Sequence, residues 1–133
     1  MRSEGLKMDK LELIKEQLID VLNLPYSFME WEKDEIPMTY WIGEIQEVPI
    51  TTENGYEESI FILTGTTRGK WFDLLSVKDD IKTNFSPIYG LRKSTDSGSI
   101  AVFYENSLPV PTGEAEIKRL QINLRIKEWK GMI

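Results

Sequence analysis

The most regular pattern in the sequence is an alternation of apolar and polar residues near the C-terminal end. From Leu120 to Ile126 every second residue is apolar, and the residues between them are Gln121, Asn123 and Arg125. Successive side chains of a β-strand point to opposite faces of a sheet. The pattern therefore predicts a strand with one face buried and the other in water.

Other segments predict three further strands. Met38 to Ile50 and Tyr56 to Thr67 are rich in aromatic and β-branched residues, and both runs are typical of strands. Between them, Asn54-Gly55 suits a tight type I′ turn, in which both central residues need a positive φ. Ser99 to Ser107 predicts the third of these strands. The strands thus arrive along the chain as two consecutive pairs.

Two segments predict amphipathic helices. The first covers residues 9–23, where Asp9 can cap the N-terminus and Glu12 lies three residues later, as in a capping box. The second covers residues 70–85, with apolar residues at helical spacing. We interpret Ser27 to Pro37 as an irregular or short extended connection and Leu91 to Ser99 as a polar loop.

The expected order of elements is α-β-β-α-β-β. Because the strands come in consecutive pairs, the expected fold class is α+β, with an antiparallel sheet and two helices packed on one face. The 133 residues are expected to form a single domain, since this length suits one hydrophobic core.

The stretch Leu63 to Trp71, LTGTTRGKW, approaches the pattern of a phosphate-binding P-loop but does not meet it. Three residues, rather than four, separate Gly65 from Gly69, and Trp71 stands where a magnesium-binding Ser or Thr is required. We interpret the stretch as a turn from a strand into a helix, with Trp71 as a core anchor.

The composition restricts the possible chemistry. The chain has no cysteine and no histidine, which removes the thiol nucleophile, the commonest general base and the usual zinc ligands. Its carboxylates lie in charge runs that are typical of a solvated surface. We therefore expect no catalytic residues, no cofactor, no metal site and no enzymatic activity.

Charge and hydropathy bear on partners and location. The net charge of −6 argues against a broad nucleic-acid-binding surface, which needs clustered Lys and Arg. No apolar run is long enough to cross a bilayer, and the first residues lack the apolar core of a secretory signal. We expect a cytoplasmic protein without membrane contact.

The polar residues of the last strand form a basic stripe in an acidic chain. It comprises Arg119, Arg125 and Lys127 and is continued by Lys130, whereas residues 30–35 are rich in Glu and Asp. The stripe is either an ordinary solvated face or a surface that meets the acidic segment of a neighbouring subunit, since opposite charges steer association. The residues predicted for this interface are Trp31, Glu32, Glu35, Arg119, Arg125, Lys127 and Trp129.

The element order and several short motifs resemble the tail-terminator, or tail-completion, proteins of long-tailed phages and prophages. Members often carry P-Y-x-V/I-x-G in the first strand, to which Tyr40 to Gly43 (YWIG) is similar. The second run, ESIFILTG, and the helix after it also follow the family layout. The likeness covers most of residues 9–128, but Leu91 to Ser99 has no counterpart in it.

The resemblance implies a structural protein rather than an enzyme. Such proteins form a ring, commonly a hexamer, at the head-proximal end of the tail tube, where they contact the tail-tube protein and the head connector. DNA passes through the lumen without being bound specifically. The expected location is the bacterial host cytoplasm and then the virion tail.

Two other classes remain open. One is a small acidic immunity or inhibitor protein that binds a basic protein partner, for which monomeric behaviour is the distinguishing property. The other is a small-molecule-binding module that uses a cavity between sheet and helices, for which a deep apolar pocket is the distinguishing feature.

Overall fold

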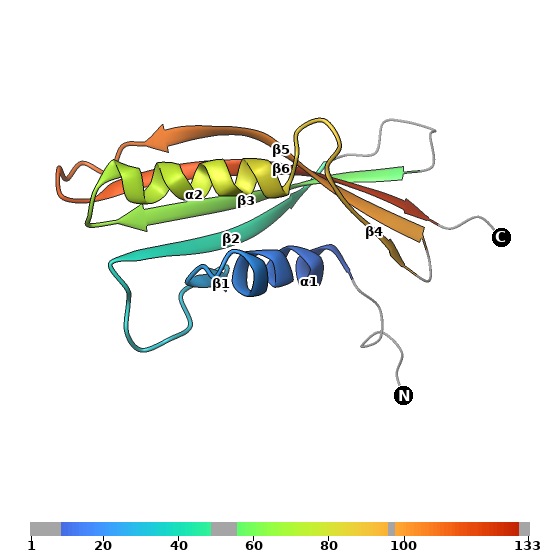
Figure 1. The fold of residues 1–133 in the computed structure, drawn as a ribbon. Helices are drawn as coiled ribbons and strands as arrows, with labels where there is room; N and C mark the ends of the chain where they lie inside the picture. Colours follow the sequence, from blue (N-terminus) through green and yellow to red (C-terminus); the bar gives the residue numbers. More distant parts are fainter. Residues whose placement is uncertain (1–8, 49–55, 96–97, 131–133) are drawn as a thin grey trace.

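The computed structural model describes residues 9–48, 56–95 and 98–130 (Figure 1). Within these ranges the chain forms one mixed sheet in the order β1-β2-β3-β6-β5-β4. The strands are β1 Tyr26–Phe28, β2 Thr39–Glu47, β3 Tyr56–Thr67, β4 Leu91–Thr95, β5 Gly98–Val110 and β6 Lys118–Lys130. The α+β class is confirmed, and the strands expected at 38–50, 56–67, 99–107 and the C-terminal end are all present. The Asn54-Gly55 turn lies outside the described residues.

The expected purely antiparallel sheet is wrong, because β1 runs parallel to β2. Tyr26 lies opposite Trp41, and the amide of Trp41 donates to the carbonyl of Pro25 at 2.8 Å. The amide of Met29 donates to Gly43 at 2.7 Å, so both ends of β1 are fixed to β2. Part of the segment interpreted as an irregular or short extended connection is therefore a short edge strand.

The other edge strand, β4, occupies most of the expected polar loop. It pairs with β5 in antiparallel register, with Leu91 opposite Val102 and Lys93 opposite Ile100. Its polar residues hid it from the sequence pattern, since among residues 91–94 only Leu91 packs against the core. Residues 96–97 lie outside the described part of the chain.

The N-terminal helix is α-helical only at first. It comprises α1 (Lys10–Lys15) and then a π-helical segment, η2 (Glu16–Val21), in which Leu22 donates to the carbonyl of Gln17 at 2.9 Å. The predicted cap is confirmed, because the amide of Glu12 donates to Asp9 Oδ1 at 2.9 Å. The expected helix at 70–85 is α2 (Trp71–Asn84).

Helix packing differs in detail from the expected pattern. Helix α2 lies along β3, β6 and β5 (Figure 1). The N-terminal helical segment reaches the same core mainly through Leu13, Ile14 and Leu18. The two helical segments also contact each other, since Asn84 Nδ2 donates to Gln17 Oε1 at 3.0 Å.

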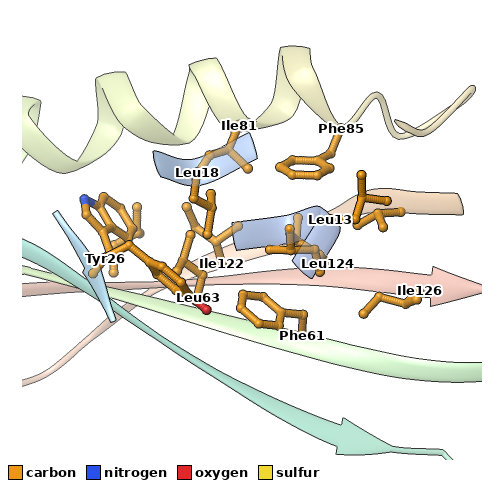
Figure 2. Packing of buried hydrophobic residues seen from close by; sticks show 14 of the residues in the cluster. Leu13, Leu18, Tyr26, Phe61, Leu63, Ile81, Phe85, Ile122, Leu124 and Ile126 are labelled. Carbon is orange, nitrogen blue, oxygen red and sulfur yellow. The ribbon is translucent and has the colours of Figure 1, made fainter. Parts of the chain in front are cut away.

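The core lies between the helices and one face of the sheet (Figure 2). The alternation predicted for the last strand is confirmed, because its four apolar residues from Leu120 to Ile126 are buried. The prediction that Trp71 anchors the core is wrong, since its side chain is 38% exposed. Trp71 is the first residue of α2, and the buried residues of this helix begin one turn later at Leu74.

A close contact between Trp41 and Gly65 joins β2 to β3. The two residues are paired across the strands, and the fully buried indole fills the space above the glycine. A Cβ atom at residue 65 would lie 2.4 Å from Trp41 Cζ3, well inside van der Waals contact. Glycine is therefore required there by space.

We predict that Gly65→Ala lowers the free energy of unfolding by about 1–3 kcal/mol, the usual cost of overpacking a core. The same substitution in a Trp41→Phe background should cost less, because the smaller ring removes part of the clash. Urea unfolding of the four chains of this double-mutant cycle measures the coupling. Strictly additive effects would contradict the proposed contact.

Candidate interaction surface

The sheet face opposite the core, called here the outer face, is covered by neither of the described helices. The polar residues of this face on β6 are set by the alternation along the strand, which points Arg119, Asn123 and Lys127 away from the buried apolar side chains. On β3 the corresponding residues include Ile60 and Ile62, which are half-buried. The outer face therefore combines polar and apolar groups in reach of solvent.

The first end of the outer face is built by one rung of the sheet. Tyr40 pairs with Thr66, and Thr66 pairs with Arg119, whose Nε donates to Thr66 Oγ1 at 3.1 Å. Together with Met38 and Arg68 these residues line a pocket of about 90 Å³. This volume is far below that of pockets for drug-sized ligands.

The acidic segment folds back against this first end. Trp31 Nε1 donates to the carbonyl of Glu35 at 2.8 Å, and the Trp31 ring lies 5.6 Å from that of Tyr40, centroid to centroid. Glu32 and Glu35 remain exposed. Trp31, predicted to contact a neighbouring subunit, thus orders its own loop and presents the two carboxylates to solvent.

The second end carries several cations around one buried aromatic ring. Phe103 is 7% exposed, and the charged groups of Arg92, Arg125 and Lys127 lie 5.7, 5.7 and 5.8 Å from its centroid. Such distances suit cation–π attraction. Arg125 is also ion-paired with Glu105 at 3.2 Å. We call Phe103, Arg92, Arg125 and Lys127 the Phe103 cluster.

Trp129 lies beside the Phe103 cluster. Its ring is 5.7 Å from that of Tyr56, the residue opposite it on β3, and Lys127 Nζ lies 5.3 Å from the Tyr56 centroid. Trp129 is half-buried, so this contact covers only part of the ring.

The structure divides the predicted interface into two groups. Arg119 lies six residues before Arg125 on one strand, a separation of about 20 Å at the usual rise per residue. Arg119 therefore belongs with Trp31, Glu32 and Glu35 at the first end. Arg125, Lys127 and Trp129 lie together at the second end. The predicted basic stripe therefore lies on one face of the sheet, but Arg119 is separated from Arg125 and Lys127 on that face.

Sequence reasoning missed Phe103 and Arg92. The signal for Phe103 was present, because the run from Ile100 to Phe103 is apolar without alternation, which is typical of a strand buried on both faces. Arg92 carried no such signal, since its position depends on the unexpected strand β4. Its side chain is held by a hydrogen bond from Nε to the carbonyl of Tyr89 at 2.9 Å.

No protein-family model matches the sequence, and comparison with curated proteins gives no significant match. In residues 9–48, 56–95 and 98–130, no three acidic side chains gather as metal ligands would. Neither helix in those ranges has the length and apolar character that crossing a membrane requires.

The acidic segment also affects a buried tyrosine. Burial, and secondarily the negative charge of Glu32, raise the pKa of Tyr26 well above its ordinary value near 10. The unfolded chain therefore releases this proton first, so the contribution of Tyr26 to stability is complete below about pH 10 and is lost as the pH rises above it.

We predict that the phenolate absorbance gained between about pH 9 and pH 11 is the same in the folded Tyr26→Phe variant as in the folded wild-type protein. The reason is that Tyr26 stays protonated in this pH range. Ultraviolet titration of the folded wild-type protein and of the folded variant measures this gain. A smaller gain in the variant would show that Tyr26 loses its proton in this range.

Proposed function

We propose that this protein is a structural subunit of a phage or prophage tail, forming a ring that caps the tail tube and joins it to the head connector. The single observation that carries the proposal is that the exposed carboxylates of Glu32 and Glu35 and the cations of the Phe103 cluster lie at opposite ends of the outer face. A head-to-tail contact requires two different, complementary surfaces on each subunit, and repeated rotation then closes a ring.

The two ends are too far apart to neutralise each other within one chain. Arg119 lies at one end and Lys127 at the other, and their separation of eight positions along β6 corresponds to about 26 Å. This distance exceeds the Debye length of about 8 Å at physiological ionic strength. The exposed Glu32 and Glu35 of one subunit are therefore available to the Phe103 cluster of another.

Support for the tail assignment comes from the sequence resemblance together with the α+β arrangement. In that setting we propose a hexamer, with the tail-tube protein and the head-connector protein as partners. The net charge of −6 suits a lumen through which DNA passes without being held, since like charges disfavour phosphate contacts. The proposed locations are the bacterial host cytoplasm and the virion tail.

An acidic immunity or inhibitor protein is the second candidate. The exposed carboxylates of Glu32, Asp34 and Glu35 favour it, because they lie close together in a segment that a basic partner would recognise. That candidate gives no role to the cations of the Phe103 cluster, which is why we rank it lower.

We predict that Arg125→Glu combined with Lys127→Glu weakens self-association at least about tenfold, because like charges then face each other across the contact. Light scattering over a concentration series measures the effect, with electron microscopy of any large species. The control is Lys15→Glu combined with Lys82→Glu, an equal charge change on exposed helix residues.

Urea unfolding of both double variants separates lost assembly from lost folding, since Arg125 and Lys127 also contact Phe103. A tail-tube capping assay then tests the function itself. If the folded Arg125→Glu, Lys127→Glu variant assembles like the wild-type protein, the second end does not take part in the contact. A strict monomer that binds a basic protein would favour the inhibitor candidate.

A further inference from the structure

The described sheet is open at both edges over part of its length. Strand β1 pairs only with Trp41 to Gly43, so from Glu44 to Glu47 strand β2 is paired on the β3 side alone. At the other edge, β4 pairs only with β5. An edge strand offers a row of N–H and C=O groups with which another chain can pair.

The two open edges run in the same direction, and their levels overlap at one rung, where β4 begins and β2 ends. One rung crosses the whole sheet, from Glu47 through Ser59, Ile126 and Val102 to Leu91. Four antiparallel pairings separate β2 from β4, so the two strands point the same way. A second copy placed beside the first by rotation thus brings β4 next to β2 as a parallel neighbour.

The charges of the two edges are opposite and match face by face. Lys93 lies opposite the buried Ile100 and so shares the helix-covered face with Glu47, which lies opposite the buried Ser59. Arg92 and Glu44 both belong to the outer face by the same alternation. The four side chains are exposed.

A small shift between the copies brings these charges together. Moving one copy by two residues along the strand direction places its Lys93 beside Glu47 of the other copy. Its Arg92 then lies diagonal to Glu44 of the other copy. An even shift preserves the alternation of faces. Strands that tilt against a closure axis are staggered in this way.

We propose that β4 of one copy adds to the open edge of β2 in a second copy of this chain, and that repetition of this contact forms a head-to-tail ring with a continuous sheet. Two β4 edges would oppose Lys and Arg, and two β2 edges would oppose Glu. The charges thus disfavour two-fold pairs and leave the contact that closes by rotation. Its biological role rests on the proposed function, but the pairing stands on the edges themselves. Because it places Arg92 near Glu44, it is an alternative to the contact of the Phe103 cluster with Glu32 and Glu35.

The first test is a charge swap read by light scattering. Glu47→Lys and Lys93→Glu should each weaken self-association at least about tenfold. Both changes in one chain should restore self-association. An equal mixture of the two single variants should also restore it, because the two variants can alternate around a ring so that opposite charges meet at every contact. Lys15→Glu and Asp20→Lys, on exposed helix residues, serve as matched controls.

The second test uses the absence of cysteine from the sequence. A chain with Glu47→Cys and Lys93→Cys, treated with a short thiol-specific bifunctional crosslinker, should give a ladder of covalent oligomers that ends at the closed ring. A chain with Glu47→Cys and Lys15→Cys is the control. A ladder no longer than that of the control would overturn the proposal, as would a double charge swap that restores nothing.

The two proposals fail in different ways. Rings that cap tail tubes but give no ladder through residues 47 and 93 would overturn edge pairing and leave the tail function standing. A ladder to a closed ring, in a protein that does not cap tubes, would support edge pairing and overturn the tail function.

Discussion

The antiparallel pairing of β3 with β6 is the contact on which the rest of the sheet depends. It joins two halves of similar order, a helix followed by β1, β2 and β3, and a second helix followed by β4, β5 and β6. Neither half encloses the core alone, because Phe61 and Leu63 of the first half pack with Ile122 and Leu124 of the second. A stable core therefore requires the long-range pairing between the halves.

Predictions from the sequence succeeded where one physical signal controlled the local structure. β6 and β3 are long strands with strong apolar or β-branched character, and α1 begins at a residue whose side chain caps it. β1 and β4 are short and gain their order from a neighbouring strand, so their own residues carry little signal. The prediction for Trp71 failed for a similar reason. Helical spacing identifies the apolar face of a helix, but it does not tell at which residue of that face burial begins.

The candidate surface was predicted in part, for a related reason. Alternation placed Arg119, Arg125 and Lys127 on one face correctly, but it contains no information on what lies beside each along the sheet. The ring of Phe103 and the guanidinium of Arg92 come from other strands, and they turn two isolated cations into a cluster. Neighbours across strands are set by the sheet order, which periodicity does not encode.

The contact of Trp41 with Gly65 also restricts how such a sequence can diverge. A larger residue at 65 is acceptable only after the indole at 41 has been replaced by something smaller, so the two positions are expected to change together or not at all. The same holds for Gly43, where a Cβ atom would lie 2.3 Å from Phe61 Cζ. Two glycines that look like ordinary breaks in a strand would then be among the slowest positions of the chain to vary.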